Sequence, residues 1–330
     1  MTTLTMAAAI NSGLRKAMER DPKVLVMGED VGVLGGVFRV TDGLHKDFGP
    51  DRVVDTPLAE AGIVGTAIGM AMRGYRPVCE IQFDGFVFPA FDQITTQLAK
   101  MHYRSHGQVK LPVTIRVPYA GGIGAIEHHS ESPEAYFAHT AGLRIVSPAT
   151  PEDGFTLIQQ AIVCPDPVVF FEPKARYWDK ADVDVDAAFD EASATAAMGR
   201  ARVVKRGDDA TIVAYGPTVR LALQAAHVSE EEGSSIEVID LRSISPLDHQ
   251  TVTRSVKKTG RCVIVHEAPT AFGVGAELAA RVTEEAFFHL EAPILRVGGF
   301  FAPYPGAKLE HDYLPSVDRL LDSLDRVLAH

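Results

Sequence analysis

Residues 55–63 read DTPLAEAGI and predict the start of a helix. Asp55 or Thr56 is a suitable N-cap, and Pro57 is favoured in the first turn of a helix. The apolar residues that follow keep a helical spacing as far as Gly74, where we expect the helix to end. The stretch therefore places one carboxylate, Glu60, in the first turn of an apolar helix.

The predicted helix carries three glycines on one face, Gly62, Gly65 and Gly69. Because a glycine inside a helix costs about 1 kcal/mol relative to alanine, we expect another backbone to approach this face closely. Glu60 has two interpretations on residue type alone. It either lies at the surface and complements the helix dipole, or it is held in a dry site for a chemical purpose. The first is the commoner case for a carboxylate, and the rest of the chain favours the second.

Apolar runs alternate with helical patterns on both sides of this stretch. Continuous apolar runs such as residues 24–27 are typical of strands buried in a parallel sheet. The alternation predicts an α/β fold made of two doubly wound domains. We expect a first domain over residues 1–175, a polar linker without periodicity over 176–197 and a second domain over 198–330. Within the first domain a helix is predicted over about residues 89–102.

The charge balance and the cysteines restrict the class of protein. The 330 residues include 43 acidic and 32 basic side chains, which gives a formal charge of -11. This balance argues against a nucleic-acid partner and permits a basic protein partner. Three cysteines lie in apolar runs at wide spacing, which is typical of buried thiols in a reducing compartment. No apolar run is long enough to span a membrane and no signal-peptide pattern follows Met1, so we expect no membrane partner and a cytoplasmic location.

Several fragments resemble functional motifs but lack an essential part. His102 and His106 have the spacing of a zinc-binding helix, but no acidic residue takes the place of the zincin base. Residues 273–275 (GVG) lack the third glycine of a dinucleotide-binding loop, so we interpret them as a tight turn. Ser130 follows His129 directly, and adjacent side chains rarely point at each other, which disfavours a nucleophile and base pair. We interpret three arginines as ordinary surface charges: Arg116, Arg144 and Arg176.

Three sets of functional side chains are predicted at one edge of the first sheet. Glu29 follows the strand at 24–27, Glu60 begins a helix, and the doublet His128-His129 lies after the glycine-rich loop 121–124. Ligands bind at the carboxyl ends of the strands in open α/β sheets. We therefore expect a ligand site at this edge.

These residues are part of a larger set of motifs that resembles the β subunit of the thiamine-diphosphate-dependent 2-oxo acid dehydrogenases over nearly the full chain. The resemblance implies a transketolase-like pyrimidine-binding domain followed by a transketolase-type carboxyl-terminal domain. Three stretches (FFEPK, HSESPEA and HEAP) look more like the branched-chain than the pyruvate members. The motifs are GED (28–30), DTPLAE (55–60), EIQF (80–83), FPAFDQ (88–93), HSESPEA (129–135), FFEPK (170–174), VIDLR (238–242), KTGR (258–261) and HEAP (266–269).

The resemblance assigns catalytic roles to Glu60 and His129. In the family the first residue hydrogen-bonds a ring nitrogen of the aminopyrimidine and favours the imino tautomer, whose nitrogen removes the acidic thiazolium proton. The histidine acts near the reacting carbonyl and the incoming lipoyl group, and imidazole suits proton handling at neutral pH. His128 is interpreted as a bystander.

The same resemblance assigns cofactor-binding positions around the pyrimidine. Glu29, Leu58 and Gln82 line the pocket together with Glu60, and Phe86 takes the place of an aromatic residue against the pyrimidine ring. Some branched-chain members have tyrosine at the Phe86 position, so any hydroxyl contact is lost in this chain.

A missing motif predicts a partner chain. Thiamine enzymes that hold the diphosphate themselves carry Gly-Asp-Gly and Asn-Asn as magnesium ligands, and neither occurs here. The resemblance therefore implies an α subunit that supplies the diphosphate site and most of the magnesium ligands, in an α2β2 heterotetramer, with no metal ligand assigned to this chain. It also implies a subunit contact at the glycine face of the helix that carries Glu60, and a lipoylated acyltransferase core as partner. Some members of the family bind potassium near the loop that corresponds to residues 164–167.

The predicted function is that of a β subunit of a branched-chain 2-oxo acid dehydrogenase, which decarboxylates a 2-oxo acid and acylates lipoamide. The nearest alternative is the β subunit of a pyruvate or acetoin dehydrogenase. A second alternative is a non-catalytic assembly subunit, in which Glu60, Gln82 and His129 would tolerate substitution by alanine without a loss of rate.

Overall fold

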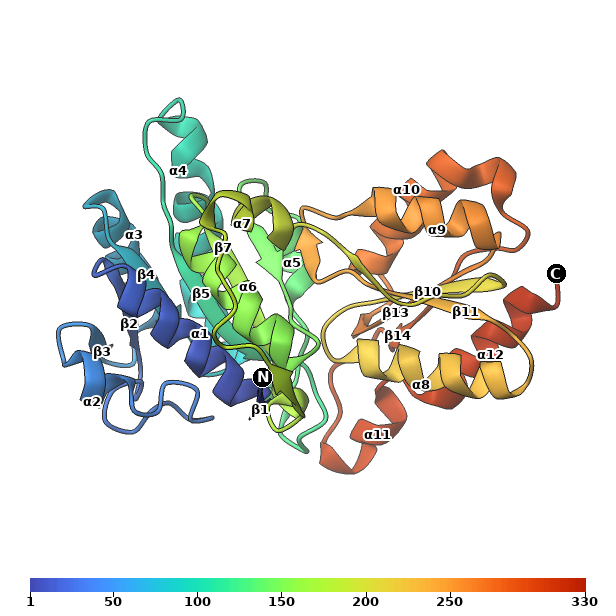
Figure 1. Cartoon of the computed structure of the whole chain (residues 1–330), viewed down its shortest axis with the longest axis horizontal. Coiled ribbons are helices and arrows are strands. Elements are labelled where there is room, and N and C mark those ends of the chain that lie inside the picture. Colours follow the sequence, from blue (N-terminus) through green and yellow to red (C-terminus); the bar gives the residue numbers. More distant parts are fainter.

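Two α/β units make up the chain, and they lie side by side in Figure 1, the first coloured blue to green and the second yellow to red. This computed structural model describes residues 1–330. The first sheet has seven strands in the order β12-β6-β7-β5-β4-β2-β3, and the second has five in the order β14-β13-β10-β11-β9. All neighbours are parallel except β12 in the first sheet and β9 in the second. The predicted doubly wound α/β class is confirmed.

The first unit follows the order that the apolar runs predict. Its strands β2 and β7 are buried at every residue, as expected for parallel strands covered by helices on both faces. Its elements are α1 (Met6–Arg20), β2 (Val24–Gly28), α2 (Leu44–Phe48), β3 (Val53–Asp55), α3 (Glu60–Met72), β4 (Arg76–Glu80), α4 (Ala99–Arg104), β5 (Thr114–Tyr119), α5 (Glu134–Ala138), β6 (Arg144–Val146), α6 (Pro151–Val163) and β7 (Val168–Pro173).

The second unit repeats the alternation of strand and helix. In Figure 1, α8 and α12 cover one face of its sheet and α9 and α10 cover the other. Its elements are β9 (Arg202–Lys205), β10 (Ala210–Ala214), α8 (Thr218–Glu231), β11 (Ile236–Asp240), β12 (Ser243–Ser245), α9 (His249–Thr259), β13 (Cys262–Pro269), α10 (Val274–Ala286), β14 (Leu295–Gly299), α11 (Glu310–Tyr313) and α12 (Val317–Leu328).

The segment 176–197 is more structured than a linker. It contains β8 (Lys180–Val183), which pairs antiparallel with β1 (Thr2–Thr5) at the chain start, and most of α7 (Glu191–Met198). Asp190 caps α7 by accepting hydrogen bonds from two backbone amides of the first turn. A four-residue strand with two exposed polar residues is too short to show a periodicity in the sequence. The domain boundaries at 175 and 198 stay predictions.

The helix predicted from Asp55 or Thr56 begins later, at Glu60. The Asp55 carboxylate accepts a hydrogen bond from the backbone amide of Gly32 (2.6 Å) instead of capping a helix. The backbone amide of Thr56 donates to the carbonyl of Gly28 (2.9 Å), which keeps the chain extended beside β2. Proline disfavours the helical conformation in the residue before it, so Pro57 helps to keep Thr56 extended. The end at Arg73 and Gly74, which has φ +86°, agrees with the prediction.

The helix predicted over residues 89–102 is confirmed as a continuous helix over residues 91–104, with an irregular middle. A 3₁₀ helix, η1 (Asp84–Ala90), precedes it and contains Pro89, a π-helical turn spans Gln93–Leu98, and α4 is its regular end. Wide π turns often occur near functional sites.

The glycine face of α3 has no neighbour within the chain. Gly62, Gly65 and Gly69 are exposed, and no atom lies within 4 Å of a side-chain carbon placed on Gly65 or Gly69. The prediction that another backbone approaches this face is therefore wrong within this chain. A contact with another subunit stays a prediction.

The two units share a continuous core. One cluster of 38 buried apolar residues includes Tyr119 of β5 and Tyr215, Ile244 and Val252 of the second unit. Strand β12, from the second half of the sequence, joins the edge of the first sheet. This packing fixes the second unit against the carboxyl end of β5. None of the helices is long and apolar enough to cross a lipid bilayer.

Candidate functional site

The predicted site residues follow four neighbouring strands at the carboxyl edge of the first sheet. Glu29 follows β2, Glu60 follows β3, Gln82 and Phe86 follow β4, and His129 follows β5. The chain reverses its direction of strand addition between β2 and β4, and such switch points are the usual ligand sites of α/β sheets.

A side-chain contact crosses this switch point. The Nε2 atom of Gln82 donates to the Asp30 carboxylate (3.2 Å) and lies 3.5 Å from the carbonyl oxygen of Glu29. Gln82 is only partly buried, so its amide group remains accessible from outside the sheet.

Glu29 and Glu60 form a pair of poorly hydrated carboxyl groups. Their exposed fractions are 9% and 7%, although Glu60 is the first residue of its helix. The pKa of Glu29 is raised, chiefly by burial and further by the negative charges of Glu60 and Asp30. The Glu60 side chain makes no hydrogen bond or ion pair with the rest of the chain. Because burial disfavours its charged form, the Glu29 carboxyl group is suited to sharing a proton with a bound ligand.

His129 is enclosed by aromatic rings. Its imidazole stacks on Phe83 with 4.0 Å between centroids and 18° between planes, and meets the ring of Phe86 edge-on at 5.2 Å. Its Nδ1 atom is buried and has no hydrogen-bond partner. His128 is also partly exposed, with its ring 4.5 Å from that of His129 and its Nδ1 3.2 Å from the Glu127 carboxylate. The different roles of the two histidines stay predictions. Phe83, the last residue of the EIQF motif, was not predicted as a site residue.

Leu58 is the one predicted site residue that the chain does not enclose. It is 80% exposed on the extended segment before Glu60. Its proposed role in a pocket therefore needs surface supplied by another molecule.

Arg116 was interpreted as a surface charge, and this is wrong. Its side chain is fully buried, and it donates to both carboxylate oxygens of Glu172 (2.6 and 2.9 Å) and to Glu80. Burial raises the pKa of Glu80, and the arginine charge opposes that rise. The three residues lie on β4, β5 and β7, so the network fixes the strand ends that carry the site. The sequence did contain a signal for this network, because each of the three apolar strands includes a charged residue.

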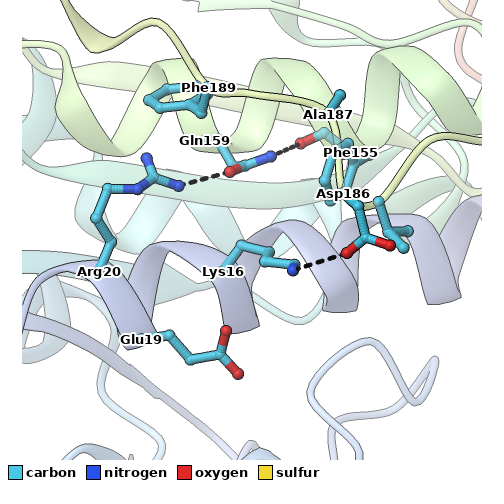
Figure 2. Close-up of a pocket in the computed structure, with 9 residues that line it drawn as sticks. Lys16, Glu19, Arg20, Phe155, Gln159, Asp186, Ala187 and Phe189 are labelled. Atoms are coloured by element: carbon cyan, nitrogen blue, oxygen red, sulfur yellow. Dashed lines mark hydrogen bonds and ion pairs between the residues drawn. The ribbon is translucent and has the colours of Figure 1, made fainter.

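A surface cavity of about 370 Å³ lies between α1, α6 and residues 185–189 (Figure 2). It contains none of the predicted site residues. Three of its charged groups already have partners, since Lys16 pairs with Asp186, and Arg20 donates to Gln159 and lies over the ring of Phe189. It is therefore not the candidate site.

Comparison with known families assigns both units. A family model described as "Transketolase, pyrimidine binding domain" matches residues 2–179, and one described as "Transketolase, C-terminal domain" matches residues 199–320. A solved structure named "Split gene transketolase, inactive beta4 tetramer" has a TM-score of 0.80 at 24% identity, covering 99% of this chain and 98% of that one. At this identity the similarity shows a shared fold.

Two curated relatives are much more similar in sequence. The chain is 61% identical over 328 residues to "Pyruvate dehydrogenase E1 component subunit beta" of Leifsonia xyli subsp. xyli, covering 99% of this chain and 96% of that protein. It is 54% identical over 327 residues to "3-methyl-2-oxobutanoate dehydrogenase subunit beta" of Mycobacterium tuberculosis, covering 99% and 92%. The chain therefore belongs to the family of 2-oxo acid dehydrogenase E1 β subunits, built from a transketolase-type pyrimidine-binding domain and a transketolase C-terminal domain.

Proposed function

We propose that this chain is the β subunit of an α2β2 2-oxo acid dehydrogenase that uses thiamine diphosphate and passes an acyl group to lipoamide on an acyltransferase core. One observation carries the proposal. Glu60 is a nearly buried carboxyl group without a partner in its own chain, beside the raised-pKa Glu29 and at the switch point of the sheet. A second chain would complete the site, because Leu58 is exposed beside it.

The available side chains fit the pyrimidine end of thiamine diphosphate. Glu60 would exchange a proton with a ring nitrogen, Gln82 offers an amide group, and Phe86 offers an aromatic face. When bound, the cofactor would supply a thiazolium carbon acid, whose deprotonated form is the nucleophile for the 2-oxo group. The Glu60 carboxyl group would hold the pyrimidine in the required tautomer, and the low hydration of the pair with Glu29 would strengthen that bond.

The same residues do not fit the diphosphate end. The chain has neither the Gly-Asp-Gly nor the Asn-Asn motif that supplies magnesium ligands in thiamine enzymes. On this ground we assign the diphosphate and the magnesium to an α subunit.

The hydroxyl group of Thr114 supports the proposal that this chain binds potassium. It is buried without a hydrogen-bond partner, and the residue pairs in register with Val168, which follows the loop 164–167. Asp166 of that loop is already paired with Arg144 at 2.9 Å. Replacing KCl by NaCl should lower the melting temperature of the wild type and not that of Thr114→Val.

For the substrate, we propose a branched-chain 2-oxo acid such as 3-methyl-2-oxobutanoate, because the FFEPK, HSESPEA and HEAP motifs resemble the branched-chain members. Pyruvate is the second candidate, favoured by the 61% identity to a relative with that name against 54% to the branched-chain one. The two are separated by measuring kcat/KM for both acids with the purified α and β subunits. A higher value for pyruvate would reverse the assignment.

Glu60→Gln tests the function itself. We expect the variant to assemble with the α subunit and to lose decarboxylation, because an amide cannot exchange the proton that a carboxyl group exchanges. Wild-type decarboxylation by the assembled variant would refute the role of Glu60. If Glu60, Gln82 and His129 all tolerated alanine at full rate, the chain would be an assembly subunit only.

A further inference from the structure

The loop that carries His129 is tied to the C-terminal unit by two carboxylates. Glu310 accepts hydrogen bonds from the backbone amides of Gly122 and Gly124 with its two oxygens, each at 3.0 Å. Glu267 accepts a third from the amide of Gly121 at 2.8 Å. All three bonds cross from the second unit to the segment that follows β5.

The glycines of this loop have the conformations that the contact requires. Gly122 and Gly124 have φ values of +87° and +69°, in the left-handed region where successive amides can converge on one anion. A side-chain carbon at Gly121 would overlap the hydroxyl of Tyr304. The Tyr304 hydroxyl donates to the Glu310 carboxylate at 2.7 Å and so holds it in place. Glu310 is only 9% exposed.

The other end of the loop is tied to the first unit. The backbone amide of Ala120 donates to the carbonyl of Glu131 at 3.0 Å, which closes the loop at its base. The amide of Glu131 donates to Asp84 at 2.9 Å, and Asp84 is paired with the buried Lys174 at 2.6 Å. His129 therefore lies on the short stretch between two sets of anchors.

We propose that Glu310 is a positioning residue, which sets the conformation of the loop 120–131 and through it the orientation of His129. This inference rests on the proposed role of His129 in acyl transfer. The backbone of His129 belongs to this loop, so a shift of the loop displaces the imidazole from Phe83, and the glycines give the loop no internal stiffness. A carboxylate with both oxygens engaged supplies the stiffness from outside, and because Glu310 lies in the other domain, the loop depends on how the two units pack.

Glu310→Gln in the assembled α and β enzyme is the principal test. An amide retains one acceptor and turns an NH2 group toward a glycine amide, so one bond is lost and the other is strained. We expect kcat to fall at least tenfold with the cofactor affinity unchanged. Hydrogen exchange measured by mass spectrometry should rise in residues 120–131 and stay at the wild-type level in β13 and β14. The matched control is Asp312→Asn, an exposed acid in the same short helix, which should change neither.

A double variant separates positioning from general destabilisation. Glu310→Gln should cost no further rate in a His129→Ala background, because a residue that acts only through His129 has nothing left to position. An additive loss, or faster exchange throughout the C-terminal unit, would overturn the inference. If Glu310→Gln reduces assembly, Tyr304→Phe removes one of three bonds to the carboxylate and should give a smaller change in the same readouts.

The two proposals fail in different ways. An inactive His129→Ala enzyme beside a Glu310→Gln enzyme with full rate and an unchanged loop refutes the positioning role alone. A fully active His129→Ala enzyme refutes the role of His129 and this inference with it.

Discussion

The imidazole of His129 lies parallel to the ring of Phe83, with 4.0 Å between their centroids. Offset stacking of this kind fixes the plane of the imidazole, and Phe86 closes a second side at 5.2 Å. The buried Nδ1 atom has no hydrogen-bond partner within the chain. The arrangement favours an orientated proton donor or acceptor over a flexible surface histidine.

We expect His129→Ala to reduce lipoamide acylation by about 100-fold, the usual contribution of a general acid or base. Thiamine diphosphate affinity should change little, because the proposed pyrimidine contacts come from Glu60 and Gln82. The measurements are acylation kinetics and calorimetric titration of the cofactor. An equal loss of both would place the side chain in cofactor binding instead.

A matched change on the neighbouring ring tests the stacking. Phe83→Leu keeps an apolar side chain of similar volume and removes the stacking surface, so the imidazole gains rotational freedom. We expect a smaller loss of acylation than in His129→Ala. A rate at the wild-type level would show that the stacking has no functional effect.

The placement of Glu29, Glu60 and His129 at one edge of the sheet could be predicted from local patterns, whereas Gln82 was assigned to the site only by the family resemblance. Each of the first three follows a short apolar run, and the carboxyl ends of parallel strands meet at one edge, so local patterns suffice. The start of α3 could not be predicted, because an aspartate that caps a helix and one that binds the amide of Gly32 look the same in a sequence.

The burial of Arg116 and the contact of Glu310 with the loop were not predicted, because both depend on residues far apart in the sequence. Arg116 is separated from Glu80 by 36 residues and from Glu172 by 56, and Glu310 is 186 residues from Gly124. No local pattern connects such residues. Only the packing of the sheet, and of one unit on the other, brings them together.

Arg116→Met should lower the stability of the first unit strongly. The variant leaves the carboxylates of Glu80 and Glu172 buried without their cation, and breaking a buried pair typically costs about 3–5 kcal/mol. The measurement is the melting temperature of the chain. The control is Arg281→Met, which removes an exposed pair with Glu277 and should cost less than about 0.5 kcal/mol. Equal effects of the two variants would contradict the buried network.

Glu134 should make stability depend on pH. Burial raises its pKa from 4.5 to about 7, with further contributions from the charges of Glu267 and Asp84, against the hydrogen bond from Tyr215. An acid whose pKa is raised in the folded state stabilises the protein most at pH values below the pKa that the same group has in the unfolded state. Stability is therefore lost as the pH rises from 4.5 to 7 and is constant above, with a total loss of at most about 3.5 kcal/mol at roughly 1.4 kcal/mol per pKa unit.

Glu134→Gln should flatten this part of the pH profile. Melting temperatures between pH 5 and 8 for the wild type and the variant give the comparison. Glu284→Gln, at an exposed position, should leave the wild-type slope unchanged. A variant with the full wild-type slope would show that the dependence comes from other buried acids, such as Asp240, whose pKa is raised to about 8.

The exposed glycine face of α3 is the remaining feature that this chain alone does not explain. Gly65 and Gly69 have open space around them, yet each costs about 1 kcal/mol relative to alanine in a helix. If another subunit packs there, as the family resemblance implies, Gly69→Ala should raise the melting temperature of the free chain and Gly69→Leu should block assembly. Size-exclusion chromatography with light scattering, with the α subunit present, measures the assembly. Full assembly of the leucine variant would show that no backbone approaches this face in the complex, and the glycines would then have no structural explanation.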